Sequence, residues 1–177
     1  MKFSTAFFAC AAFSLSASAL AADGSITING EITSQTCQIN GNGGGADFTV
    51  TLPTVSTSAL PTAGATAGRT PFNIALTNCS PNSGNVAVYF EPNATVDLLT
   101  GRLKNTAANG AENVEVGLLN NDHSDIQLGG AEAAQNMQFV ALENGQATLN
   151  YFAQYVATDA STAGKVEART MYSIVYQ

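Results

Sequence analysis

The sequence predicts a single all-β domain, built as an antiparallel sandwich or barrel, and three observations lead to this prediction. Apolar residues alternate with polar ones in several separate segments, which is the pattern of half-buried strands. Turn-forming residues divide these segments, and 177 residues leave room for one domain rather than two. A helical pattern extends to no more than one turn, near residues 131–135.

The alternating pattern places the strands along the chain. The two carboxyl-terminal segments have the clearest pattern. In residues 147–155 the odd positions are apolar, and in residues 166–176 the even positions form a single face. Residues 40–45 and the Asn144-Gly145 pair predict turns, and residues 53–68 predict a long exposed excursion. The predicted strands cover residues 25–32, 48–52, 72–77, 86–90, 114–119, 147–155 and 166–176.

The amino terminus has the features of a secretory signal peptide, which we assign to residues 1–21. Lys2 supplies a positive charge, an apolar stretch follows, and Ala19-Leu20-Ala21 is a small-x-small cleavage pattern. Cleavage after Ala22 fits the pattern as well. The apolar stretch is too short to span a bilayer, and no later segment approaches the roughly 20 apolar residues that spanning requires. We therefore expect an exported protein without direct membrane insertion.

Removal of the signal peptide leaves two cysteines, Cys37 and Cys79. An even pair in an exported chain predicts a disulfide, which would close a loop of about 42 residues and stabilise the fold by about 4 kcal/mol. A metal site has no support, because there is no C-x-x-C motif and His123 is the only histidine. We expect no metal and no cofactor.

The composition excludes several classes of function. Only 11% of the residues are charged, the net charge is −7, and the six Lys and Arg residues are scattered, which argues against nucleic-acid binding. There is no Trp, and His123 lies among turn-forming residues, where a solvated loop histidine is the simpler interpretation. No pair of carboxylates stands out as an acid and base. We expect that the protein is not an enzyme.

An unusual feature is a strand-like segment before the first cysteine, with a glycine on its apolar face. Four segments, which extend over essentially the whole chain after the signal peptide, carry a family pattern. They are Ile26-Thr-Ile-Asn-Gly30-Glu-Ile32 followed by Cys37, Pro71-Phe-Asn-Ile-Ala-Leu-Thr-Asn-Cys79, Tyr151-Phe-Ala-Gln-Tyr155 and Tyr172-Ser-Ile-Val-Tyr-Gln177. With these segments, the chain resembles the chaperone–usher pilins and is most similar to the type 1 fimbrial major subunits.

The resemblance implies an incomplete immunoglobulin-like sandwich that lacks its last strand and is completed by a strand donated from another chain. Residues 22–36 would form a donor-strand extension that leads into the first strand, and residues 37–177 would form the pilin domain. The donor residues would be Ile26, Ile28, Gly30 and Ile32, with Gly30 at the point where the groove is too narrow for a side chain. The acceptor groove would be lined partly by Tyr172, Ile174 and Tyr176 of the last strand.

The resemblance also implies a function and partners. The protein would be a structural subunit of a surface fimbria that supports cell adhesion, and its partners would be identical or related subunits, a periplasmic chaperone and an outer-membrane usher. One alternative is a low-copy adaptor or minor pilin of the same system. Another is a stand-alone exported β-sandwich that binds carbohydrate, and an exported hydrolase is a third.

Overall fold

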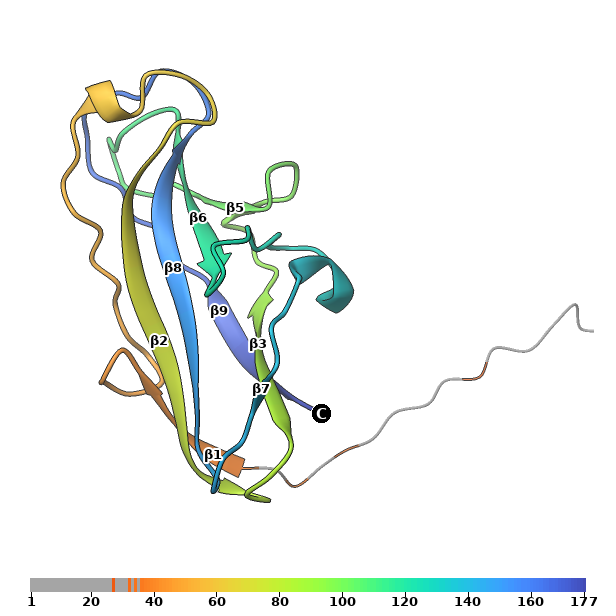
Figure 1. The fold of residues 1–177 in the computed structure, drawn as a ribbon. Coiled ribbons are helices and arrows are strands. Elements are labelled where there is room, and N and C mark those ends of the chain that lie inside the picture. The colour runs from red at the N-terminus through yellow and green to blue at the C-terminus, as the bar shows by residue number, and fades with distance from the viewer. Residues whose placement is uncertain (1–26, 28–31, 33, 35) are drawn as a thin grey trace, which may run out of the picture. The chain divides into compact units, whose positions relative to one another are not determined.

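The computed structural model describes Thr27, Ile32, Ser34 and residues 36–177, and its strands form two antiparallel sheets (Figure 1). The larger sheet has six strands in the order β1-β2-β8-β6-β5-β4, and the smaller has three in the order β7-β3-β9. The all-β prediction is confirmed. The strands are Thr36–Gly41 (β1), Thr66–Ser80 (β2), Asn85–Glu91 (β3), Val96–Asp97 (β4), Arg102–Lys104 (β5), Val114–Asn120 (β6), Val140–Ala141 (β7), Ala147–Ala157 (β8) and Met171–Tyr176 (β9).

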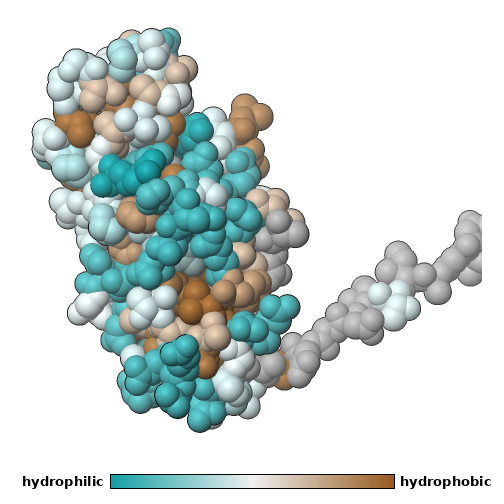
Figure 2. All heavy atoms as spheres, viewed as in Figure 1, coloured by the Kyte–Doolittle hydropathy of each residue, from teal (hydrophilic) through white to brown (hydrophobic). Residues whose placement is uncertain are grey.

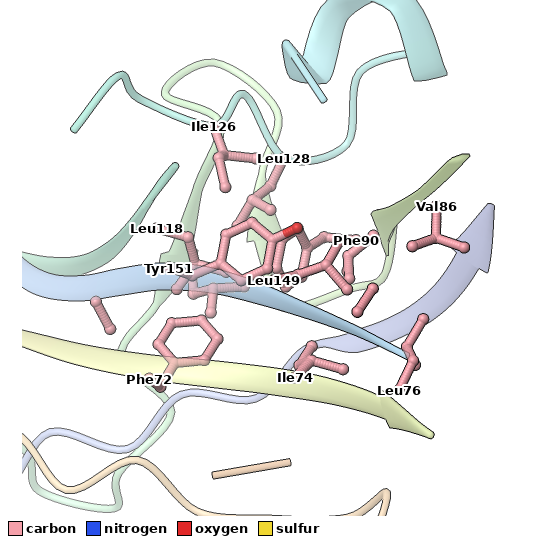
Figure 3. Close-up of a cluster of buried hydrophobic side chains, with 14 of the residues drawn as sticks. Phe72, Ile74, Leu76, Val86, Phe90, Leu118, Ile126, Leu128, Leu149 and Tyr151 are labelled. Atoms are coloured by element: carbon pink, nitrogen blue, oxygen red, sulfur yellow. The ribbon is translucent and has the colours of Figure 1, made fainter. Parts of the chain in front are cut away.

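The pairing of β2 with β8 forms the centre of the larger sheet. Phe72 lies opposite Tyr151 and Ile74 opposite Leu149, and all four side chains are buried. Because side chains alternate between the two faces of a strand, this register places the apolar residues of both strands on the side of the core. Figure 3 shows these side chains, together with those of Leu118 and neighbouring strands, filling the space between the sheets.

The smaller sheet covers this core with β3. Val86, Val88 and Phe90 are almost fully buried and lie opposite Tyr176, Ile174 and Tyr172 of β9, respectively. The even-numbered residues of β9 therefore point toward the core, as the alternation predicted. The pairing of β7 with β3 does not extend as far as Phe90. There the side chain of Gln135 makes the backbone hydrogen bonds that a neighbouring strand would make.

Gln135 belongs to η2 (Glu132–Gln135), the one helical turn that the sequence predicted in this region. Its side-chain amide donates to the carbonyl oxygen of Phe90 at 2.7 Å and accepts from the Phe90 amide at 3.0 Å. The side chain is only 1% exposed. These two bonds satisfy buried backbone groups that would otherwise be costly, because an unpaired buried polar group loses its hydration.

Two local features agree with the sequence prediction. Cys37 and Cys79 form a disulfide that joins β1 to β2. Asn144 and Gly145 have φ angles of 53° and 74°, as the tight turn predicted for this pair requires.

On the face shown in Figure 2, polar residues cover most of the surface, and apolar residues gather in separate patches. No helix among the described residues is long and apolar enough to cross a membrane.

The extents of several strands differ from prediction. β2 begins at Thr66, inside the predicted excursion, and β1 includes Asn40 and Gly41, which were expected in a turn. Residues 48–52 alternate as predicted but belong to no strand, and the last strand begins at Met171 rather than at residue 166. An alternating pattern reports which face of a segment is buried, whereas strand assignment also requires a backbone partner.

The burial of Tyr151 predicts a loss of stability at alkaline pH. Burial raises the pKa of Tyr151 to about 12, and a backbone hydrogen bond at Val88 offsets only part of this effect. Below pH 10 the hydroxyl is protonated in both states. Between pH 10 and pH 12 only the unfolded chain loses the proton, so the free energy of unfolding should fall by up to about 3 kcal/mol. Urea unfolding at several pH values measures this fall in the free energy of unfolding. The fall should be shallower for Tyr151→Phe than for the wild type, and an equal fall in both would show that Tyr151 is not its cause.

Candidate functional site

β9 is the edge strand of the smaller sheet. In the part of the chain that the structure describes, it pairs with β3 on one side and with no strand on the other. Its core-facing residues Tyr172, Ile174 and Tyr176 are only half-buried, although their partners on β3 are buried. A strand edge that leaves backbone groups unpaired beside apolar side chains is a site for strand addition.

Residues 46–55 follow the turn after β1, and their first part contacts Tyr172 near the start of β9. Figure 1 shows this segment as an extended ribbon that rises from β1 to η1 (Thr57–Ala59). Phe48, Val50 and Leu52 are half-buried and pack against the core, whereas the intervening residues are exposed. Within the described residues the segment has no place in a sheet, so its backbone is also without a strand partner.

The segment and the last part of the chain lie side by side and run in opposite directions. Near one end the rings of Phe48 and Tyr172 meet edge to face, with centroids 6.2 Å apart. Near the other end, Val55 and Val166 line the same cavity. We call the space between residues 46–55 and residues 166–176 the acceptor groove. The apolar residues of the two segments that are half-buried and pack against the core are Phe48, Val50, Leu52, Val166, Ala168, Tyr172, Ile174 and Tyr176.

The cavity at the Val166 end has a volume of about 740 Å³. Val55, Leu60, Val114 and Tyr155 contribute apolar side chains to its wall, together with Val166. Burial raises the pKa of Tyr155, which is consistent with a ring in an apolar environment. The cavity is open, and it provides room for an apolar side chain at the end of the acceptor groove.

Tyr172 reaches across the acceptor groove to the first residue of the facing segment. Its hydroxyl donates a hydrogen bond of 2.7 Å to the carbonyl oxygen of Ala46. Burial and the negative charge of Asp47 raise the pKa of Tyr172 above its ordinary value. Phe48 continues the contact toward the core, because its ring lies 6.0 Å from that of Phe72.

Tyr172, Ile174 and Tyr176, which the sequence predicts to line a groove, lie half-buried on the core-facing side of β9, and their role in a groove stays a prediction. The predicted donor residues Ile26, Ile28 and Gly30 lie outside the described residues, and the side chain of Ile32 is fully exposed. Sequence reasoning missed the opposite wall. The alternation of residues 48–52 was the available signal, but it predicted an ordinary paired strand rather than an unpaired one.

The polar candidates His123 and Asp122 lie together in one exposed turn. His123 is exposed in a turn, where its ring lies 4.6 Å from that of Phe152. Hydrogen bonds from Ser124 lower the pKa of the Asp122 carboxyl, so this group is engaged within the same turn. Among the described residues, no three His, Cys, Asp or Glu side chains gather closely enough to hold a metal ion.

Comparison with known proteins identifies the family. The model of the family FimA, type-1 fimbrial protein A, matches residues 52–177. The chain belongs to this family. It is 55% identical over 161 residues to the major fimbrial subunit SMF-1 of Stenotrophomonas maltophilia, and the match covers 88% of this chain and 94% of that protein. It is 46% identical over 167 residues to the F17 fimbrial protein of Escherichia coli, with 92% of each chain covered.

Solved structures of fimbrial proteins share the fold of this type-1 fimbrial protein. The antigen and type I fimbria protein of Burkholderia pseudomallei aligns with a TM-score of 0.57 at 25% identity, covering 80% of this chain and 97% of that chain. The P pilus rod subunit PapA aligns with a TM-score of 0.60 at 20% identity, covering 80% and 99%. The fold is therefore the incomplete immunoglobulin-like sandwich of the chaperone–usher pilins, as the sequence predicted.

The half-burial of the groove wall predicts a difference between two similar truncations. Leu149→Ala should cost about 2–5 kcal/mol in the monomer, because Leu149 is 1% exposed in the core. Ile174→Ala should cost about 1 kcal/mol, because the half-buried Ile174 gives up fewer contacts when it is truncated. Denaturant unfolding of the two monomeric variants compares these costs. An equal cost would mean that Ile174 lies in a closed core and that the acceptor groove is not open.

Proposed function

We propose that this fimbrial subunit polymerises head to tail, with the acceptor groove of each copy filled by the extension of residues 22–36 from another copy. The observation that supports this proposal is a pair of segments, residues 46–55 and the edge strand β9, that meet at Tyr172 and that have no strand partner between them among the described residues. A single added strand would satisfy both backbones and cover the half-buried apolar side chains between them. The resulting polymer would be a surface fimbria that supports cell adhesion.

The extension has the pattern that this groove requires. Ile26, Ile28 and Ile32 fall on one face of a strand, which spans about 20 Å from residue 26 to residue 32. Burial of each isoleucine would contribute about 2 kcal/mol, and backbone pairing would add to this. Gly30 lies on the same face and would pass the narrow part of the acceptor groove, where a side chain would not fit.

The direction of the added strand follows from the smaller sheet, in which both pairings are antiparallel. A donor that continues this pattern runs antiparallel to β9, so its carboxyl-terminal part approaches Val166. Ile32 of the donor would then enter the cavity of about 740 Å³ beside Val166 and Leu60. This arrangement gives the fully exposed Ile32 a place to be buried in the polymer.

The open groove also accounts for the proposed partners in export. The signal peptide of residues 1–21 would direct the chain to the periplasm, where exposed apolar residues and an unpaired strand edge favour aggregation. A periplasmic chaperone that supplies a temporary strand would protect the acceptor groove, and an outer-membrane usher would bring two subunits together for the exchange. The function is structural and needs neither catalysis nor a cofactor.

Two neighbouring substitutions test the donor strand. Ile28→Asp places a charge on the face that enters the groove and should abolish polymers, whereas Asn29→Asp places it on the opposite face and should leave them intact. The measurement is the ladder of polymers on unheated denaturing gels of surface material. Deletion of residues 22–30 should also abolish the ladder. Persistence of the ladder in the deletion variant would refute the exchange, and a lone monomer band for the wild type would favour a stand-alone domain.

A further inference from the structure

The backbone of residues 46–55 leaves the larger sheet after a well-fixed turn. The turn is held by hydrogen bonds from the Gly41 amide to the Gly45 carbonyl at 2.9 Å and from the Gly44 amide to the Gly41 carbonyl at 2.8 Å. Beyond the turn, the described structure gives the segment no sheet pairing. The segment must therefore keep its position by side-chain contacts, in a molecule whose acceptor groove has not yet received a strand.

Tyr172 and Phe48 provide these contacts. The Tyr172 hydroxyl bonds to the Ala46 carbonyl oxygen at 2.7 Å, and its ring meets Phe48 edge to face. Phe48 is held in turn by Phe72 and by close packing against Gly41, where an added Cβ would collide with the Phe48 ring. Tyr172 thus links the edge of the smaller sheet to the beginning of the segment across the acceptor groove.

The length of the Tyr172 side chain suits a groove with room for one added strand. A strand inserted between two others needs about 4.8 Å on each side, so the two walls must stand about 9.6 Å apart. A short side chain could not reach across such a space, whereas a tyrosine with a hydrogen bond at its tip can. Because the bond is made by the Tyr172 side chain, it uses no backbone group of residues 171–176, and these groups remain available to a donor.

We propose that Tyr172 is a positioning residue that keeps the acceptor groove open to the width of one strand before the donor arrives. The proposal rests on the proposed function, since it concerns how readily the donor enters the same groove. A groove that is already ordered does not have to be ordered during binding, and this lowers the barrier to insertion. Asp47 lies close to the Tyr172 hydroxyl, and its negative charge favours the protonated form that donates the bond.

The chain offers a matched control for this hydroxyl. Tyr89 of β3 also donates to a backbone carbonyl, that of Gly130, at 3.3 Å. Neither Tyr89 nor Gly130 lines the acceptor groove. Tyr172→Phe and Tyr89→Phe each remove one hydroxyl and retain the ring, so a general effect of losing a tyrosine hydrogen bond should appear in both variants.

The experiment measures the rate at which the mature chain, from residue 22 onward, forms polymers after refolding. Tyr172→Phe should slow the appearance of the ladder on unheated denaturing gels about five-fold, the factor expected from one lost hydrogen bond. Tyr89→Phe should polymerise at the wild-type rate. Thermal unfolding of the two monomers should show similar small losses of stability, so that the difference in rate is not explained by stability.

Three outcomes would overturn the proposal, and they are distinguishable. An unchanged rate for Tyr172→Phe would mean that the hydroxyl does not position the segment, and a faster rate would mean that it obstructs the donor. Equal slowing in Tyr89→Phe would indicate a general loss of stability. If the wild-type chain forms no polymer at all, the proposed function fails, and the role of Tyr172 fails with it.

Discussion

The unpaired edge of β9 is the constraint on which the rest of this structure depends. One side of the strand pairs with β3, and on the other side no strand pairs with it among the described residues, where Tyr172 contacts Ala46 and Phe48. Backbone groups on this side and half-buried side chains such as Ile174 require a further strand to become fully buried. The family places the chain among fimbrial subunits, and the proposed function uses this edge to join one copy to the next.

An incomplete sandwich must still remain folded while its groove is open, and the distribution of burial shows how this is achieved. The paired residues of β2 and β8, among them Ile74 and Leu149, are almost completely buried and do not depend on the groove. The disulfide of Cys37 fixes β1 beside β2. The fully buried core thus lies between β2 and β8 of the larger sheet and β3 of the smaller one, whereas the core-facing side chains of β9 are half-buried.

The sequence predicted the fold class, the disulfide, the turn at Asn144 and the inward face of β9, because all of these depend on local pattern or on two cysteines. It did not predict that residues 48–52 would be extended without a partner, since alternation reports burial and not pairing. Short strands such as β4 and β7 were also missed, because two residues show no period. The contact of Tyr172 with Ala46 joins residues 126 positions apart and has no sequence signature.

Amide hydrogen exchange of β9, compared between monomer and polymer, tests the central claim most directly. In the monomer, the amides of alternate β9 residues that point away from β3 should exchange rapidly, because they have no hydrogen-bond partner. In the polymer, the same amides should become strongly protected, while those bonded to β3 change little. Equal protection of the outward amides in both states would contradict the account, because it would show that no strand is added at this edge.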